Sequence, residues 1–127
     1  MSGPLICVLT YTIKPGKQEE ARKRCAYLVD FVETNEPRMI AFHLYLDQEG
    51  NTLTIVQVHP DSASMEFHMQ VNAKHFATAF DWLDTSLNQQ YFGPISDALA
   101  AELAKWDDET FTHLPVHEAG FTRSTIR

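Results

Sequence analysis

One stretch, residues 61–84, constrains the fold of this chain more than any other. Read as a helix at about 100° per residue, it has an apolar sector with a narrow polar stripe beside it, His68, Asn72 and His75. Hydrophobic residues flank this polar stripe on both sides, so we expect it to point into the protein. The stretch forms one long helix or two helices end to end. The apolar sector contains Met65, Met69, Ala73, Phe76, Phe80 and Leu83.

Buried polar side chains need hydrogen-bond partners, and the partners of the polar stripe decide its meaning. If the partners are other side chains, the stripe is architecture. If the partner is a ligand, the stripe is part of a site. A pocket that holds the histidines beside an apolar wall favours catalysis, whereas a fully paired stripe without a cavity favours the structural interpretation.

The rest of the chain alternates between strand and helix patterns. Runs rich in β-branched and aromatic residues, bounded by turn residues, predict the strands, and apolar positions at helical spacing predict the helices. Pro115 predicts that the last strand lies at an edge or carries a bulge. The expected strands cover residues 4–13, 38–47, 52–59, a short weak 86–92 and 110–122, and the further helices cover 17–35 and 95–106.

This order predicts an α+β fold: β-α-β-β-α-β, the ferredoxin-like split βαβ arrangement, plus a C-terminal helix and strand. We expect a single domain over residues 1–127, with a C-terminal α/β extension from about residue 86. The strands are apolar on both faces, yet this fold places its helices on one face only. A second copy packed sheet to sheet would cover the other face, so we expect a homodimer.

Charge and composition exclude several classes of function. The formal net charge of −7 argues against binding nucleic acid or an anionic membrane surface, which require Lys/Arg patches. No apolar run approaches the roughly 20 residues of a membrane span. The N-terminus lacks the pattern of a signal peptide, and Cys7 and Cys25 form no disulfide framework. We therefore expect reduced cysteines and a cytoplasmic protein.

Three features resemble the antibiotic biosynthesis monooxygenase type of dimeric α+β barrel. They are the strand–Lys14-Pro15-Gly16-Lys17–helix junction, the hairpin at Gly50-Asn51, and the run from Ile55 to Phe76. His68 stands at the spacing of the family's helical His, and His75-Phe76 looks like its second His-Phe pair. The resemblance covers roughly residues 5–84 and implies a homodimeric barrel.

The chain departs from the family pattern at four places. Gln57 stands where the family often has Glu, His59 stands at its aromatic position, and two residues are inserted between the two histidines. The first strand also lacks the Asn of the haem-degrading branch. The resemblance implies an oxygenase that needs no metal or flavin, or a quinol oxidase, and these departures argue against haem degradation.

In an oxygenase without a cofactor, an electron-rich phenol, quinol or enol loses a proton and its anion reduces O₂. Such an enzyme needs an apolar cavity, a base and donors to hold the anion. We expect His68 or His75 as the base and Asn72 as the residue that orients the substrate oxygen. The expected wall contains Trp82, Phe67, Phe76 and Tyr45, and the strand residues that face the cavity or the dimer seam are His43, Gln57 and His59.

Two alternatives accompany this hypothesis. The chain could be a non-catalytic small-molecule-binding or stress-related homodimer with the same cavity. A metal site is not expected, since the six histidines include no H-E-x-x-H motif and helix positions i and i+7 lie about 10 Å apart along the axis. No cofactor is expected, and the predicted partners are a small aromatic substrate and O₂.

Overall fold

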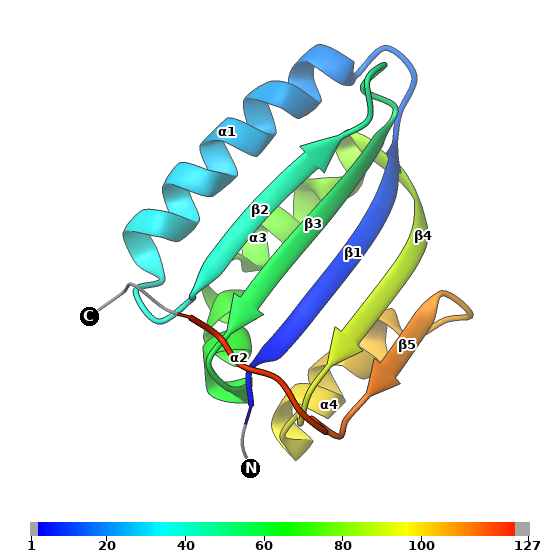
Figure 1. Cartoon of the computed structure of the whole chain (residues 1–127). Helices are drawn as coiled ribbons and strands as arrows, with labels where there is room; N and C mark the ends of the chain where they lie inside the picture. The colour runs from blue at the N-terminus through cyan, green and yellow to red at the C-terminus, as the bar shows by residue number, and fades with distance from the viewer. Residues whose placement is uncertain (1–2, 124–127) are drawn as a thin grey trace.

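The computed structural model describes residues 3–123 and contains one five-stranded sheet with all helices on one of its faces (Figure 1). The loops between the elements are short. The order is the expected β-α-β-β-α-β, followed by a further helix and strand. The elements are β1 (Leu5–Ile13), α1 (Gln18–Asn35), β2 (Ala41–Leu46), β3 (Thr52–His59), α2 (Ser62–Val71), α3 (Ala73–Thr78), the 3₁₀ turn η1 (Ala79–Asp81), β4 (Leu83–Phe92), α4 (Asp97–Leu103), the 3₁₀ turn η2 (Ala104–Trp106) and β5 (Phe111–Leu114).

The sheet order is β2-β3-β1-β4-β5, with β1 at the centre. β1 pairs antiparallel with both β3 and β4, β2 pairs antiparallel with β3, and β5 adds to β4 in parallel. The first four strands thus have the ferredoxin-like arrangement, which confirms the predicted fold class. The extension contributes α4 and the edge strand β5.

The two faces of the sheet differ in burial. Along β1, Leu5, Cys7, Leu9 and Ile13 point toward the helices and are buried. The alternate residues of the strand lie on the other face and are only half-buried in the single chain. In Figure 1 this second face is turned to the viewer, and the red segment after β5 crosses it near the ends of the strands.

The stretch that carries the polar stripe is two helices, not one. α2 ends at Val71, and Asn72 has φ −103° and ψ 12°, outside the helical range. α3 follows and passes into the 3₁₀ turn η1. The break changes the direction of the apolar sector, so that Ala73 and Phe80 are exposed although continuous helical spacing predicted them in the core.

Asp61 is the N-cap of α2, because its side chain accepts a hydrogen bond from Ser64 N at 3.0 Å. The same carboxylate binds Arg38 at 2.6 Å. Arg38 is engaged in this ion pair and Met39 N donates to Glu36 O in the turn after α1, so β2 is shorter than the predicted 38–47.

The C-terminal strands also differ from the sequence prediction. The expected short strand at 86–92 begins at Leu83 and has ten residues, because it pairs along nearly the whole of β1. The last strand stops at Leu114 instead of reaching residue 122, since Pro115 has no N–H to donate to a ladder. Pro115 does lie at the end of an edge strand, as predicted.

α4 closes the helical layer over β4. Its N-cap is Ser96, which accepts a hydrogen bond from Leu99 N at 3.0 Å. Leu99 and Leu103 are buried against Met65 of α2 and the β1 side chains. Within residues 3–123, no helix combines the length and the apolar character needed to cross a bilayer.

Candidate active site

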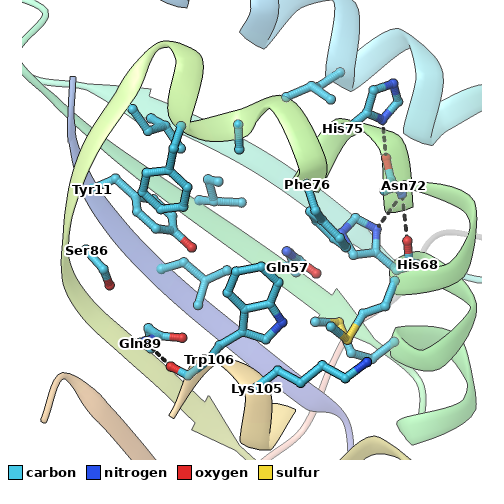
Figure 2. A pocket seen from close by; sticks show the side chains of 18 of the residues that line it. Tyr11, Gln57, His68, Asn72, His75, Phe76, Ser86, Gln89, Lys105 and Trp106 are labelled. Carbon is cyan, nitrogen blue, oxygen red and sulfur yellow. Dashed lines mark hydrogen bonds between the residues drawn. The ribbon is translucent and has the colours of Figure 1, made fainter. Parts of the chain in front are cut away.

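A pocket of about 320 Å³ lies between the sheet and the helices (Figure 2). β1, β3 and β4, with one residue of β2, form its floor, and α1, α2, α3, η1 and η2 form its other walls. Most of its lining is hydrocarbon. The apolar wall contains Leu9, Ile55, Met65, Met69, Phe76 and Trp82.

His68 is the central polar residue at one end of this pocket. The side chain is nearly buried, and its Nδ1 lies 2.9 Å from Oε2 and 3.0 Å from Oε1 of Glu36. A carboxylate only accepts hydrogen bonds, so Nδ1 carries the proton. In the neutral ring, Nε2 therefore holds a lone pair.

Nε2 of His68 has no hydrogen-bond partner among residues 3–123. Every fully buried side-chain nitrogen or oxygen in this part of the chain has a hydrogen-bond partner. Because Nε2 has none, it must be accessible from the pocket. Figure 2 shows the ring beside Phe76 and directed into the pocket. A carboxylate-oriented imidazole with an open Nε2 has the geometry of a general base.

Asn72 connects His68 to His75 through both ends of its side-chain amide. Its Nδ2 donates to Glu36 Oε2 at 2.7 Å and to the His68 carbonyl at 2.8 Å. Its Oδ1 accepts from His75 Nδ1 at 2.9 Å. The helix break at Asn72 places the side chain where it can make these contacts. Because both ends of the amide are already engaged, Asn72 orients the two histidines and Glu36.

His75 lies at the edge of the pocket, half-buried between α1 and α3. Its ring stands edge-on to Phe31, with centroids 4.6 Å apart, and to Tyr27 at 5.5 Å. Partial burial lowers the pKa of His75, and the nearby positive charge of Lys74 lowers it further. The polar stripe thus does point inward, with His68 at the pocket wall and His75 at its margin.

Behind His68, Gln57, His59 and Ser64 form a second buried chain of hydrogen bonds. His59 binds Ser64 Oγ through Nδ1 at 2.7 Å and Gln57 Oε1 through Nε2 at 2.9 Å. Burial lowers the pKa of His59 to about 3, so it stays neutral. With its oxygen on His59, Gln57 presents its amide nitrogen to the pocket that it lines.

Polar residues also occupy the far end of the pocket. Tyr11, Ser86 and Gln89 lie there, on β1 and β4 (Figure 2). Burial, together with the charge of Asp108, raises the pKa of Tyr11 to about 12, so the phenol keeps its proton. The pocket is therefore an apolar space with a hydrogen-bonding group at each end.

The structure separates the expected site residues into two groups. His68, His75, Asn72, Trp82, Phe76 and Gln57 line the pocket. Phe67, Tyr45, His43 and His59 do not line it.

Each residue outside the pocket has a clear reason for its position. Tyr45 and His43 project from β2 on the face away from the helices, where both are exposed. Phe67 is 44% exposed on the outer side of α2. His59 is fully buried behind Gln57 and reaches the pocket only through that residue.

Sequence reasoning missed Glu36 and Tyr11. Glu36 carried a signal, because an acidic residue at the C-terminal end of a helix opposes the helix dipole unless another group offsets it. Tyr11 continues the alternation of buried β1 residues, which places it on the helix-facing side. Nothing in the sequence near Glu36 indicated that its partner is His68, which lies 32 residues away.

The described residues contain no candidate metal site and no activated thiol. Among residues 3–123, no group of three or more His, Cys, Asp or Glu side chains is arranged to hold a metal ion. Burial raises the pKa of the Cys7 thiol to about 12 and raises that of Cys25 as well. Neither cysteine is an activated thiolate.

Solved structures of low sequence identity share the fold. MupZ from Pseudomonas fluorescens is 18% identical with a TM-score of 0.79, and the match covers 97% of this chain and 91% of that one. PA3566 from Pseudomonas aeruginosa is 23% identical with a TM-score of 0.61, over 72% of this chain and 95% of that one. Rv0793 from Mycobacterium tuberculosis is 13% identical with a TM-score of 0.63, over 76% and 99%.

At these identities the likeness establishes the fold alone. The match to MupZ includes the C-terminal helix and strand, since it spans nearly the whole chain. No curated protein sequence matches the chain. The sequence model of the antibiotic biosynthesis monooxygenases matches residues 4–82, which is more than half of the chain. The chain therefore belongs to the antibiotic biosynthesis monooxygenase family.

Proposed function

We propose that this protein is a cofactor-independent monooxygenase that acts on a small phenolic, quinol or enolic substrate in the pocket. One observation carries the proposal: Glu36 holds Nδ1–H of His68, which leaves the basic Nε2 open to an apolar cavity. Proton abstraction by a positioned base typically contributes about 10²–10⁴-fold to a rate.

The first step is the transfer of the substrate's acidic proton to Nε2 of His68. The imidazolium formed is stabilised by the Glu36 carboxylate at 2.9 Å. The amide nitrogen of Gln57 supplies a donor for the oxyanion that remains on the substrate. Asn72 acts as a positioning residue, because its contacts hold Glu36 and both histidines and engage both of its donor hydrogens.

The anion then reduces O₂ inside the apolar pocket. At an activated CH₂ carbon, O₂ adds to give a hydroperoxide that takes the proton back from His68. Loss of water leaves a carbonyl, so one oxygen atom stays on the substrate and the other leaves as water. The substrate supplies all the electrons, and the hydrocarbon lining excludes bulk water from the reactive anion.

Oxygen uptake with a panel of small quinols and anthrones tests this function. The wild type is compared with His68→Gln, which removes the base, and with Glu36→Gln, which loses the charge behind it. We expect the His68 variant to lose about 10²–10⁴-fold in the enzyme-dependent rate. Glu36→Gln is expected to lower kcat more than it changes KM and to shift the pH profile, as a positioning residue should.

His117→Gln is the control, since this exposed histidine lies outside the pocket. The same rate in the wild type and His68→Gln, after subtraction of spontaneous oxidation, would remove His68 from the mechanism. An absence of enzyme-dependent uptake across the whole panel would remove the monooxygenase proposal itself.

We also propose that a second copy covers the bare face of the sheet. Ile6, Val8, Val56 and Val58 lie there half-buried in the single chain. Light scattering should give about twice the 14.5 kDa chain mass, and Val8→Glu should give a monomer. Ala26→Glu, on the exposed side of α1, should leave the mass unchanged. A monomeric wild type would contradict the proposal.

The second candidate is a non-catalytic binding protein with the same pocket. The hydrogen bonds of Asn72 favour it, since they tie this residue of the polar stripe to Glu36 and to both histidines. In that case His68→Gln changes ligand affinity, measured by calorimetry, while no ligand is consumed.

A further inference from the structure

The hydrogen bonds at the far end of the pocket run in one direction, toward Asp108. Thr110 donates to Asp108 Oδ1 through both its backbone N–H, at 2.8 Å, and its hydroxyl. These bonds lower the pKa of Asp108, so the carboxylate is charged and can only accept. The hydroxyl proton of Thr110 is therefore committed to Asp108, and its oxygen is left as an acceptor.

Gln89 and Ser86 continue this direction. The Gln89 amide nitrogen donates to Trp106 O at 2.9 Å, Thr110 Oγ1 at 3.1 Å and Asp108 Oδ1 at 3.4 Å. Ser86 Oγ lies 3.3 Å from Thr110 Oγ1 and must be the donor, because the Thr110 proton is already engaged. Every donor of the two side chains thus points away from the pocket.

What remains toward the pocket is a pair of acceptor atoms. Gln89 is buried, and its Oε1 has no hydrogen-bond partner in the described chain. Every side-chain oxygen there that is fully buried does have a partner. Oε1 is therefore open to the pocket that Gln89 lines (Figure 2). The free lone pairs of Ser86 Oγ lie next to it on the same strand, β4.

Tyr11 completes this end of the pocket. It pairs with Ser86 across β1 and β4, and its neighbour Leu9 pairs with Gln89. Its hydroxyl has no hydrogen-bond partner among residues 3–123, and its ring is fixed edge-on against Phe80 at 6.0 Å. The phenol can donate one hydrogen bond and accept another.

From this arrangement we infer a second binding subsite, made by Tyr11, Ser86 and Gln89, that accepts a hydrogen bond from an uncharged hydroxyl of the ligand. A carboxylate does not fit, because it would meet two acceptor oxygens and the charge of Asp108 with one phenol as its only donor. Ser86 and Gln89 lie beyond residues 4–82, so two of the three residues of this subsite come from the part of the chain outside the family match.

The subsite defines the ligand class more closely. Tyr11 and the Gln57 partner Cys7 are four residues apart on β1, which separates the two ends of the pocket by about 13 Å of strand. His68 takes a proton-bearing group at its end, and Tyr11, Ser86 and Gln89 take another. The ligand is thus an elongated apolar molecule with a hydroxyl at each end. This description of the ligand rests on the proposed role of His68, whereas the subsite itself does not.

Calorimetric binding of matched probes tests the subsite without any turnover. The probes are naphthalene-2,6-diol and biphenyl-4,4′-diol, each compared with the analogue in which one hydroxyl is a methyl and the analogue in which it is a carboxylate. The proteins are the wild type, Tyr11→Phe and Ser86→Ala. Tyr45→Phe is the matched control, because it removes a phenol hydroxyl on the opposite face of the sheet.

For at least one of the two lengths, we expect the diol to bind about tenfold more tightly than its methyl analogue, the value of one good hydrogen bond. Tyr11→Phe and Ser86→Ala should each remove most of this preference, and Tyr45→Phe should not. The carboxylate should bind more weakly than the diol.

Equal binding of the diol and methyl probes at both lengths would overturn the subsite, and so would a carboxylate that binds as tightly as the diol. A preference that both variants leave intact would also overturn it. If the preference exists but no quinol is oxidised, the subsite stands and the monooxygenase proposal fails.

Discussion

The Glu36 carboxylate lies 2.9 Å from Nδ1 of His68, although the two residues are 32 positions apart in the chain. Glu36 follows the last turn of α1, where the helix dipole disfavours a negative charge. The donors of His68 and Asn72 offset that cost. This contact fixes the ring of His68 and joins the end of α1 to the break between α2 and α3.

Removal of Glu36 is expected to destabilise the fold strongly. Glu36→Ala should lower the free energy of unfolding by about 2–5 kcal/mol, since it leaves two buried donors, on His68 and Asn72, without their acceptor. Glu33→Ala on the exposed side of the same helix should change it by less than about 0.5 kcal/mol. Urea denaturation measures both, and similar small effects would show that the Glu36 contact contributes little.

Acid should destabilise the protein through His59. Its pKa is lowered to about 3 in the folded chain from 6.5, so between these values only the unfolded chain takes up the proton. The contribution of His59 is complete above pH 6.5, and about 2 kcal/mol of it is lost between pH 7 and pH 5.

The pH dependence can be assigned to His59 by substitution. The free energy of unfolding of His59→Gln should fall less steeply between pH 7 and pH 5 than that of the wild type. The exposed His117 is the control, and His117→Gln should keep the wild-type slope. Parallel slopes for His59→Gln and the wild type would mean that His59 titrates normally.

The two tryptophans should be distinguishable by fluorescence. Trp82 is 4% exposed and Trp106 is 41% exposed, although both line the pocket. Trp106→Phe should leave a blue-shifted emission that acrylamide quenches weakly, whereas Trp82→Phe should leave a red-shifted emission that it quenches strongly. The reverse result would contradict the packing of η2 against the pocket.

Gly93, just after β4, tests the close approach of the chain to Pro4 before β1, and Gly16 is its control. Gly93 has φ +115°, and a Cβ there would lie 2.5 Å from the Pro4 carbonyl oxygen. Gly93→Ala should therefore destabilise the fold by about 2–4 kcal/mol. At Gly16, φ is +82° with open space around it, and Gly16→Ala should cost only about 1 kcal/mol, the backbone term. Equal losses in urea denaturation would show that the close approach at Gly93 relaxes.

Local pattern was enough to predict much of this protein. The alternation along β1 and the helical spacing of α1 depend on neighbours in the chain, and both elements are present close to the predicted bounds. The polar stripe was predicted to face inward because apolar residues flank it, and His68 and Asn72 are buried. The β-α-β-β-α-β order then allows few arrangements of the sheet.

The sequence by itself determined the order of the elements, the fold class and the inward direction of His68. Only the tertiary structure decided that His68 meets Glu36, that Asn72 breaks the helix and bonds to Glu36, and that Tyr45 and His43 lie on the opposite face from the pocket. The physical reason is the distance along the chain over which each signal is set. Hydrophobic periodicity depends on residues a few positions apart, whereas hydrogen-bond partners and the outward face of β2 depend on how segments distant in the chain pack against one another.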